Sequence, residues 1–195
     1  MLYLIILSLH LQDGWGRSFI LGVYDAEYAI IPTLLVMLFA LTCLLPTFEY
    51  SRETFYHHNV VFLIRDKSRS KSYLKIVWRN MMCIGGIMIM LQITGLLLDR
   101  QVTSRLCSLA IVQLLAVENL VVFQTILEIK WSALGALLVC LLGTLSLQLL
   151  HSPVLGLFHT RRLELPGNVA ILAELAILAI LVGIGCLSIR KQEVY

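Results

Sequence analysis

The sequence predicts an all-α membrane protein, a single transmembrane domain of about six helices over residues 1–195. The first observation is composition: 59% of the residues are hydrophobic and only 14% are charged, whereas soluble domains carry about 25% charge. The second is the length of the apolar runs, because a helix needs about 20 residues to cross a bilayer. The third is a cluster of Lys and Arg between two of these runs, since such asymmetry orients membrane proteins.

The apolar runs supply the spans in order. Five of them have the length and composition of a transmembrane helix: residues 29–48, 80–98, 106–127, 131–150 and 169–189. Residues 1–12 are also apolar but fewer, and we expect a short or incomplete first span there. Because lipid offers the backbone no hydrogen-bond partner, only helices or a closed barrel can cross it. These runs are too long for barrel strands, so they predict helices.

The cluster of basic residues lies in the loop 49–79, between the second and third predicted spans. Six of the 15 Lys and Arg residues fall between Arg65 and Arg79. If this loop is cytoplasmic and the spans alternate, ten cations lie inside and five outside, which is the usual positive-inside bias. The chain is then a multi-pass membrane protein with both termini in the cytoplasm.

The same loop is longer than topology requires, and its first half has helical periodicity. Apolar residues recur at i, i+4, i+7 and i+8, at Tyr56, Val60, Leu63 and Ile64. We expect an amphipathic helix parallel to the membrane. The alternating cations of Arg65–Lys71 favour an extended turn after it. Two interpretations stay open: a loop with no protein partner, or a helix that docks on a cytoplasmic protein.

The residues of this loop resemble a motif of the type-2 ABC exporter permeases. The matching residues are Phe48-Glu49 at the end of a span, Arg52-Glu53, Arg65 with Ser68-Arg69, and Lys75 before the next span. The six-span layout, with a large first cytoplasmic loop, is similar as well. The resemblance implies a coupling helix that sits on a separate ATP-hydrolysing subunit. The residues implied in this contact are Glu49, Arg52, Glu53, Tyr56, Val60, Leu63, Arg65 and Arg69.

The resemblance also implies the partners and the location. A phosphate-binding G-x-x-x-x-G-K-[ST] motif does not occur in the chain. ATP and magnesium would therefore bind to the partner ATPase, and no cofactor is expected in this chain. A second permease chain, identical or related, would complete the translocation path in a bacterial cell membrane, and no nucleic acid is expected as a partner.

Polar residues within the predicted spans are the candidates for a substrate path or a subunit interface. They are Gln113, Glu118, Asn119 and Glu174. A carboxylate at the bilayer centre costs a few kcal/mol, so Glu118 should face the bundle interior or stay protonated. The other interpretation is a buried carboxyl that bonds to a neighbouring helix. Glu174 lies within two turns of the outer end of the last span and could reach the interface.

Metal binding and catalysis are not predicted. The five cysteines lie inside apolar runs without CxxC spacing, which favours small hydrophobic roles. His151 and His159 have no third ligand in the sequence around them. Clustered Asp, His or Ser signatures of intramembrane enzymes are also absent from the sequence.

Two functions follow. The first is the permease subunit of an ATP-driven exporter for an amphipathic or apolar cargo, such as a peptide or an antimicrobial. Small permeases of this family are associated with bacteriocin export or self-immunity. The second is a non-transporting immunity or sensor protein that binds a peptide within the bilayer and needs no docking helix.

Overall fold

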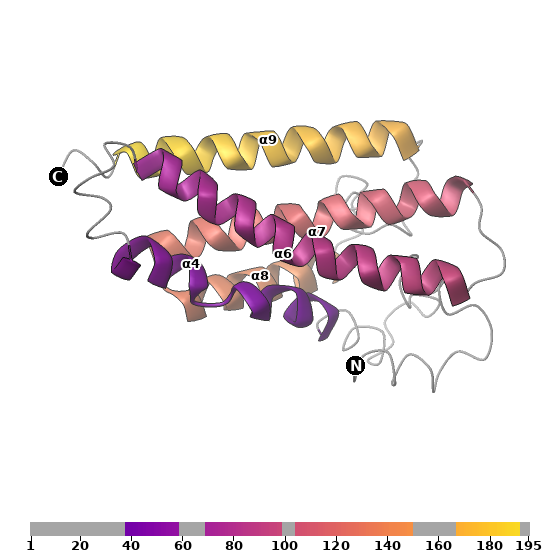
Figure 1. The fold of residues 1–195 in the computed structure, drawn as a ribbon, viewed down its shortest axis with the longest axis horizontal. Helices are drawn as coiled ribbons and strands as arrows, with labels where there is room; N and C mark the ends of the chain where they lie inside the picture. The colour runs from indigo at the N-terminus through magenta and orange to yellow at the C-terminus, as the bar shows by residue number, and fades with distance from the viewer. Residues whose placement is uncertain (1–37, 59–68, 99–103, 150–166, 192–195) are drawn as a thin grey trace.

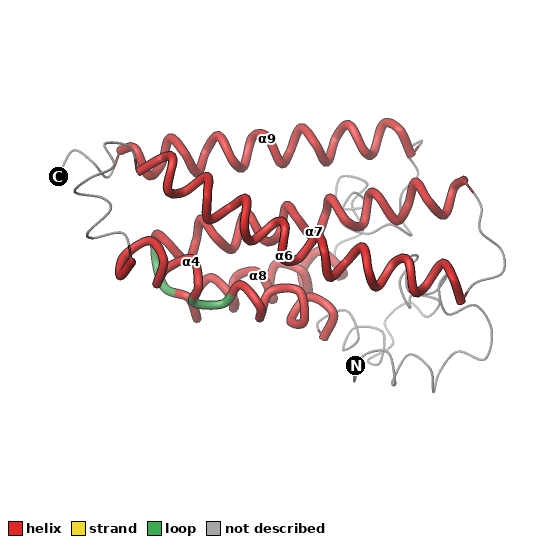
Figure 2. Tube along the Cα trace, in the orientation of Figure 1, coloured by secondary structure: helices red, strands yellow, loops and turns green. Residues whose placement is uncertain are grey.

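The computed structural model describes residues 38–58, 69–98, 104–149 and 167–191. Nearly all of these residues are helical, and only residues 48–49 and 131–132 lie outside helices (Figure 2). No strand occurs in these four ranges. The prediction of an all-α protein is therefore confirmed for the described part of the chain.

Four long helices build the bundle. They are α6 (Arg69–Leu98), α7 (Ser104–Lys130), α8 (Ala133–Leu149) and α9 (Gly167–Lys191). A break of two residues separates α7 from α8, and the hydroxyl of Ser132 accepts a hydrogen bond from the backbone N–H of Gly135 at 3.0 Å. Ser132 thus caps the first turn of α8, where the N–H groups have no partner within the helix.

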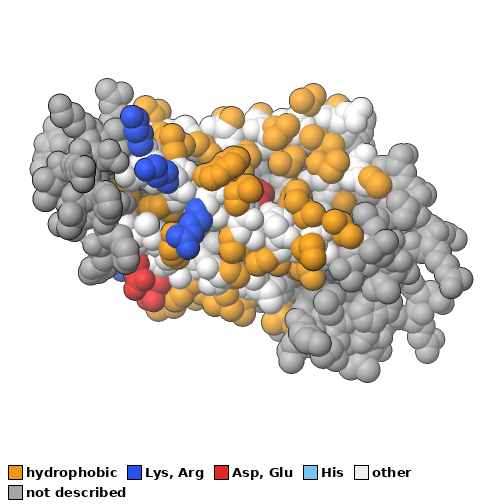
Figure 3. All heavy atoms as spheres, in the orientation of Figure 1, with side chains coloured by type: hydrophobic (Ala, Val, Ile, Leu, Met, Phe, Trp, Pro, Cys, Tyr) orange, Lys and Arg blue, Asp and Glu red, His pale blue; other side chains and the backbone are white. Residues whose placement is uncertain are grey.

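Helix α7 is the centre of the bundle. It contacts α6, α8 and α9, and α6 also contacts α9 (Figure 1). Because consecutive helices run in opposite directions, α6 begins at the end of the bundle where α7 and α9 finish (Figure 1). We call this the basic end, because it carries Arg69, Lys71, Lys75, Arg79 and Lys130. Figure 3 shows Lys and Arg side chains gathered there, while apolar side chains cover much of the remaining described face.

Within the described ranges, three helices are long and apolar enough to cross a membrane, by length and composition. They are Arg69–Ile93, Cys107–Lys130 and Asn168–Ile189, while Ala133–Ser146 is apolar but shorter. These helices agree with a membrane protein and overlap the spans predicted at 80–98, 106–127 and 169–189. The span predicted at residues 1–12 and residues 29–37 of the one at 29–48 lie outside the described residues, while residues 38–47 of the latter are helical. The six-span layout stays a prediction.

The third predicted span differs at its start, because α6 begins at Arg69 rather than at Asn80. The side chains of Tyr73, Ile76 and Val77 are buried, each at most 3% exposed. They pack with Phe55 and Ile189 in an apolar cluster at the basic end. This packing holds residues 69–79 in the helix, so the extended turn predicted for the alternating cations is wrong at Arg69 and Lys71. A helix buries the inner side chains while its cations face outward.

A tight turn leads into the first part of the predicted coupling segment. Residues 38–44 are helical, and the short helix η1 (Leu45–Thr47) follows with Pro46 near its start. Glu49 then adopts a left-handed backbone with φ of 62°. Helix α4 (Tyr50–Glu53) follows and continues as the π-type turn η2 (Thr54–His58). The turn at residues 48–49 separates η1 from α4, and α4 lies against α7.

The helices approach closely at glycine. A side chain at position 185 of α9 would collide with the ring of Tyr73 on α6. A Cβ at position 85 of α6 would lie 2.6 Å from the Oε1 atom of Glu118 on α7. These two glycines allow α6 to pack on its neighbours, as small residues do in membrane helix interfaces.

Candidate functional site

The central polar contact of the bundle joins α7 to α9. The side-chain amide of Asn119 donates to the carboxyl Oε2 of Glu174 at 2.5 Å and to the backbone carbonyl of Glu174 at 3.2 Å. Asn119 is 1% exposed and Glu174 is fully buried. The expectation that Glu174 could reach the membrane interface is therefore wrong, because its side chain points toward α7 rather than along its own helix.

Glu118 is buried on another side of α7. Its carboxyl lies against Gly85 of α6, in the space that the missing side chain leaves. Cys43 and Met88 pack in one apolar cluster with Val117, the residue next to Glu118, and the thiol of Cys43 donates to the sulfur of Met88 at 3.9 Å. The Oε2 atom of Glu118 has no hydrogen-bond partner among the described residues. The prediction that Glu118 faces the bundle interior is confirmed.

Gln113 lies apart from these carboxyls. It accepts a hydrogen bond from the amide of Gln92 on α6 at 3.3 Å, and the same amide donates to the carbonyl of Ala110 at 2.8 Å. Among the four predicted interior residues, the structure therefore brings Asn119 and Glu174 into direct contact. Gln113 instead joins α6 to α7 about one and a half turns closer to the start of α7.

The sequence did not predict a second polar cluster, which lies at the basic end. Glu128 is fully buried on α7, and Gln124 donates to its Oε1 atom at 2.7 Å. The Glu128 carboxyl also lies close to Ser51 and to the backbone of Glu49, and its Oε2 atom has no hydrogen-bond partner among the described residues. A carboxyl at the first N–H groups of α4 stabilises the helix start. The available signal was the four-residue spacing of Gln124 and Glu128, but the predicted span ended at residue 127.

The same cluster ties α4 to α6. The amide of Asn80 donates to the hydroxyls of Ser51 at 2.9 Å and of Thr125 at 3.0 Å. The hydroxyl of Tyr56 donates to the backbone carbonyl of Ile129 at 2.8 Å. The segment from Tyr50 to His58 is thus held by hydrogen bonds to both α6 and α7. These contacts fix its position relative to the long helices.

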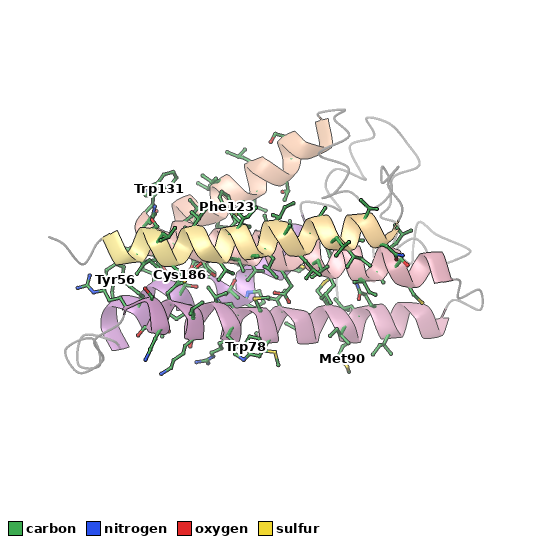
Figure 4. The ribbon with its side chains drawn as sticks, turned by 90° about the horizontal axis from the view of Figure 1, so that it is seen from above. Tyr56, Trp78, Met90, Phe123, Trp131 and Cys186 are labelled. Atoms are coloured by element: carbon green, nitrogen blue, oxygen red, sulfur yellow. The ribbon has the colours of Figure 1, made fainter. Side chains whose placement is uncertain are left out.

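The opposite face of this segment is open. Ser51 and Phe55 are buried beneath it, while Arg52, Glu53 and Tyr56 are exposed. Tyr56 is 43% exposed even though its hydroxyl is bonded, and it lies at the basic end of the bundle (Figure 4). The stretch from Ser51 to Tyr56 therefore has one packed face and one exposed face.

The other residues predicted for ATPase coupling are placed as follows. Glu49 is exposed in the tight turn before α4, and Arg69 is half-buried at the start of α6. Val60, Leu63 and Arg65 lie outside the described residues. Arg79, which was not among them, lies over the ring of Tyr50 at 4.3 Å and donates to its hydroxyl.

No group of three or more His, Cys, Asp or Glu side chains that could hold a metal occurs among the described residues. The five cysteines are free thiols. The thiols of Cys43 and Cys140 are buried in the described interior together with the carboxyl, amide and hydroxyl groups named above.

Comparisons of the chain with family models, with curated proteins and with solved structures give no match. The fold and the site thus define a class, a helical protein with membrane-length helices and a polar interior around α7, and the function is argued from the residues.

Proposed function

We propose that this chain is the membrane-spanning permease subunit of an ATP-driven exporter of the type-2 ABC class. A separate subunit binds ATP and magnesium and hydrolyses the nucleotide. The cargo is amphipathic or apolar, such as a peptide or an antimicrobial. The protein is located in the cell membrane of a bacterium. The basic end faces the cytoplasm, and this orientation follows the positive-inside bias.

The observation that carries the proposal is the geometry of the segment from Tyr50 to His58. A coupling helix must be firmly attached to the transmembrane helices on one side and accessible on the other. Ser51 and Phe55 are buried on the bundle, and hydrogen bonds from Asn80 and Tyr56 add to this attachment. Arg52 and Glu53 remain exposed. A motion of the docked subunit would then be transmitted to α6 and α7.

A second permease chain is part of the proposal. Only 17% of the membrane-length apolar stretch of α9 is buried within the chain, against 61% of that of α7. Ala176 and Ala179 lie on its exposed side, and a side chain at Gly183 would meet nothing within 4 Å. Small residues allow close approach of a second helix. Glu118 and the Asn119–Glu174 pair would lie beside the cargo path inside one subunit.

The test reverses the charges of the exposed face. The full chain carrying Arg52→Glu and Glu53→Lys is purified from native membranes beside the unaltered chain. A photoreactive ATP analogue then labels any nucleotide-binding subunit in the complex. We expect the labelled subunit to fall at least about tenfold in the variant, because a repulsive interface costs several kcal/mol, while the amount of permease in the membrane stays the same.

A matched control is Lys130→Glu, which changes an exposed charge at the same end of the bundle but outside α4. It should keep the labelled subunit. If the unaltered chain carries no nucleotide-binding subunit, the exporter function fails. If the charge-reversed chain keeps that subunit, α4 is not the coupling helix.

The alternative is a non-transporting immunity or sensor protein that binds a peptide in the bilayer. It is favoured by the way the interior polar groups pack on the chain itself: Asn119 bonds to Glu174, and Glu118 fills the space at Gly85. This function requires no ATPase, so the same labelling experiment separates the two.

A further inference from the structure

We propose that the outer face of α6 at the basic end binds an anionic phospholipid. The headgroup lies at Lys71 and Lys75, and the acyl chains lie along Trp78 and Met82. This proposal is independent of the exporter function, because it concerns a surface that faces away from the bundle.

The length of α6 places these lysines at headgroup depth. The helix has 30 residues, about 45 Å at a rise of about 1.5 Å each. The hydrocarbon core of a bilayer is about 30 Å thick and needs about 20 of them. The stretch Asn80–Leu98 contains no charged residue, while all the cations of α6 lie between Arg69 and Arg79. The uncharged part therefore fills the hydrocarbon core, and the basic part extends into the headgroup layer.

The cations and the apolar residues of this end share one side of the helix. At about 100° per residue, Lys71, Leu74, Lys75, Trp78 and Met82 fall within an arc of about 100°. All five are exposed, with Trp78 at 65% and Met82 at 61%. Figure 4 shows Trp78 pointing away from the bundle. The residues of the opposite side are buried, so this side is the one that contacts the surroundings.

The apolar part of this face continues along the helix. Ile89 and Ile93 lie in the same direction and are 45% and 48% exposed. A side chain at Gly86 between them and Met82 would meet nothing within 4 Å. An acyl chain can therefore follow the helix from Trp78 towards the middle of the membrane, while the headgroup stays at the lysines.

Charge complementarity identifies the occupant. Lys71 and Lys75 are exposed and form no ion pair with another described residue. Arg79 next to them is turned to the ring of Tyr50. Two flexible ammonium groups near an interfacial tryptophan match a lipid with a net negative headgroup. A zwitterionic lipid has the same acyl chains but no net charge to attract.

The experiment uses Trp78 as a local probe in the full chain. The sequence has three tryptophans, so Trp15→Phe and Trp131→Phe leave Trp78 alone. The protein is reconstituted in vesicles of phosphatidylcholine with a minor fraction of phosphatidylglycerol, and one of the two lipids carries bromine, which quenches nearby tryptophan. We expect phosphatidylglycerol to be enriched at Trp78 by roughly fivefold for each lysine. With Lys71→Gln and Lys75→Gln together, the enrichment should disappear, so that the lipid composition at Trp78 equals that of the bulk bilayer.

Two controls keep the test specific. Trp131 as the sole tryptophan reports on the same end of the bundle away from the outer face of α6, and Lys130→Gln removes a cation there. Lys130→Gln should leave the enrichment at Trp78 unchanged. The proposal is overturned if both lipids quench Trp78 in proportion to their bulk fractions. It is also overturned if the enrichment survives loss of both lysines, or if Lys130→Gln lowers it as much. If the lysine variants instead lose a protein partner with lipid contact unchanged, the surface binds protein.

Discussion

Asn119 should stabilise the fold through its contact with Glu174. The substitution Asn119→Ala removes two hydrogen bonds to α9, each worth about 0.6 kcal/mol on average between membrane helices. It also leaves the carboxyl of Glu174, which is fully buried, without its described partner, and an unpaired buried group costs about 1–3 kcal/mol. We expect a loss of about 2 kcal/mol in the free energy of unfolding, or roughly 30-fold in the folding equilibrium.

The assay is reversible unfolding in mixed micelles, where an unfolding detergent is titrated into a mild one and helix content is followed by circular dichroism. Met90→Ala is the matched control, because Met90 is 69% exposed on α6, and it should change stability by less than about 0.5 kcal/mol.

The double variant tests the cause. Asn119→Leu with Glu174→Met replaces both partners by apolar groups, and such replacements are often neutral or stabilising. It should therefore be more stable than the single variant Asn119→Ala. The reasoning is refuted if Asn119→Ala costs less than about 0.5 kcal/mol, or if the double variant loses the sum of its two single substitutions.

Five further substitutions can be measured in the same assay. Gly185→Val should cost more than about 2 kcal/mol because the new side chain meets the Tyr73 ring, whereas Tyr73→Phe should be neutral or stabilising because the buried hydroxyl has no described partner; destabilisation by the latter would contradict the packing. Asn80→Ala should lose about 1 kcal/mol with its bonds to α4 and α7, and an unchanged midpoint would show that these bonds contribute nothing. Phe55→Ala should lose about 3 kcal/mol from the apolar cluster at the basic end, while Tyr56→Phe, which removes one bond to Ile129, should lose less than about 1 kcal/mol; the reverse order would mean that the segment is held by the tyrosine.

The helices of the described chain could be predicted because their cause is local. Runs of about 20 apolar residues satisfy the backbone only as helices in lipid. The predicted spans 106–127 and 169–189 lie within two or three residues of α7 and α9 at each end. The start of α6 was misplaced by eleven residues, from 69 to 80. The cations between residues 69 and 79 interrupt the apolar run, so the predicted start came too late. Tyr73, Ile76 and Val77 nevertheless lie on the buried side of the same helix.

Which polar side chains contact one another depends on how the helices pack, and the sequence did not predict it. Asn119 and Glu174 are 55 positions apart, and Glu174 lies near the end of a predicted span, from which its side chain could have reached the interface. Glu128 lay just beyond the predicted end of its span, so its burial beside α4 was not anticipated. Whether such a residue faces lipid or the interior depends on the rotation of its helix about the axis, which the hydrophobicity of the run does not set.

The sequence by itself determined the helical class, the approximate ends of most helices and the concentration of positive charge at one end. These properties follow from the number of apolar residues in each run and from the order of the runs. The tertiary structure decided which polar groups meet, which side of α4 is free and which side of α6 faces outward. The physical reason is that close approach at Gly85 and Gly185 fixes the rotation of the neighbouring helices, and that rotation brings residues from distant parts of the chain together.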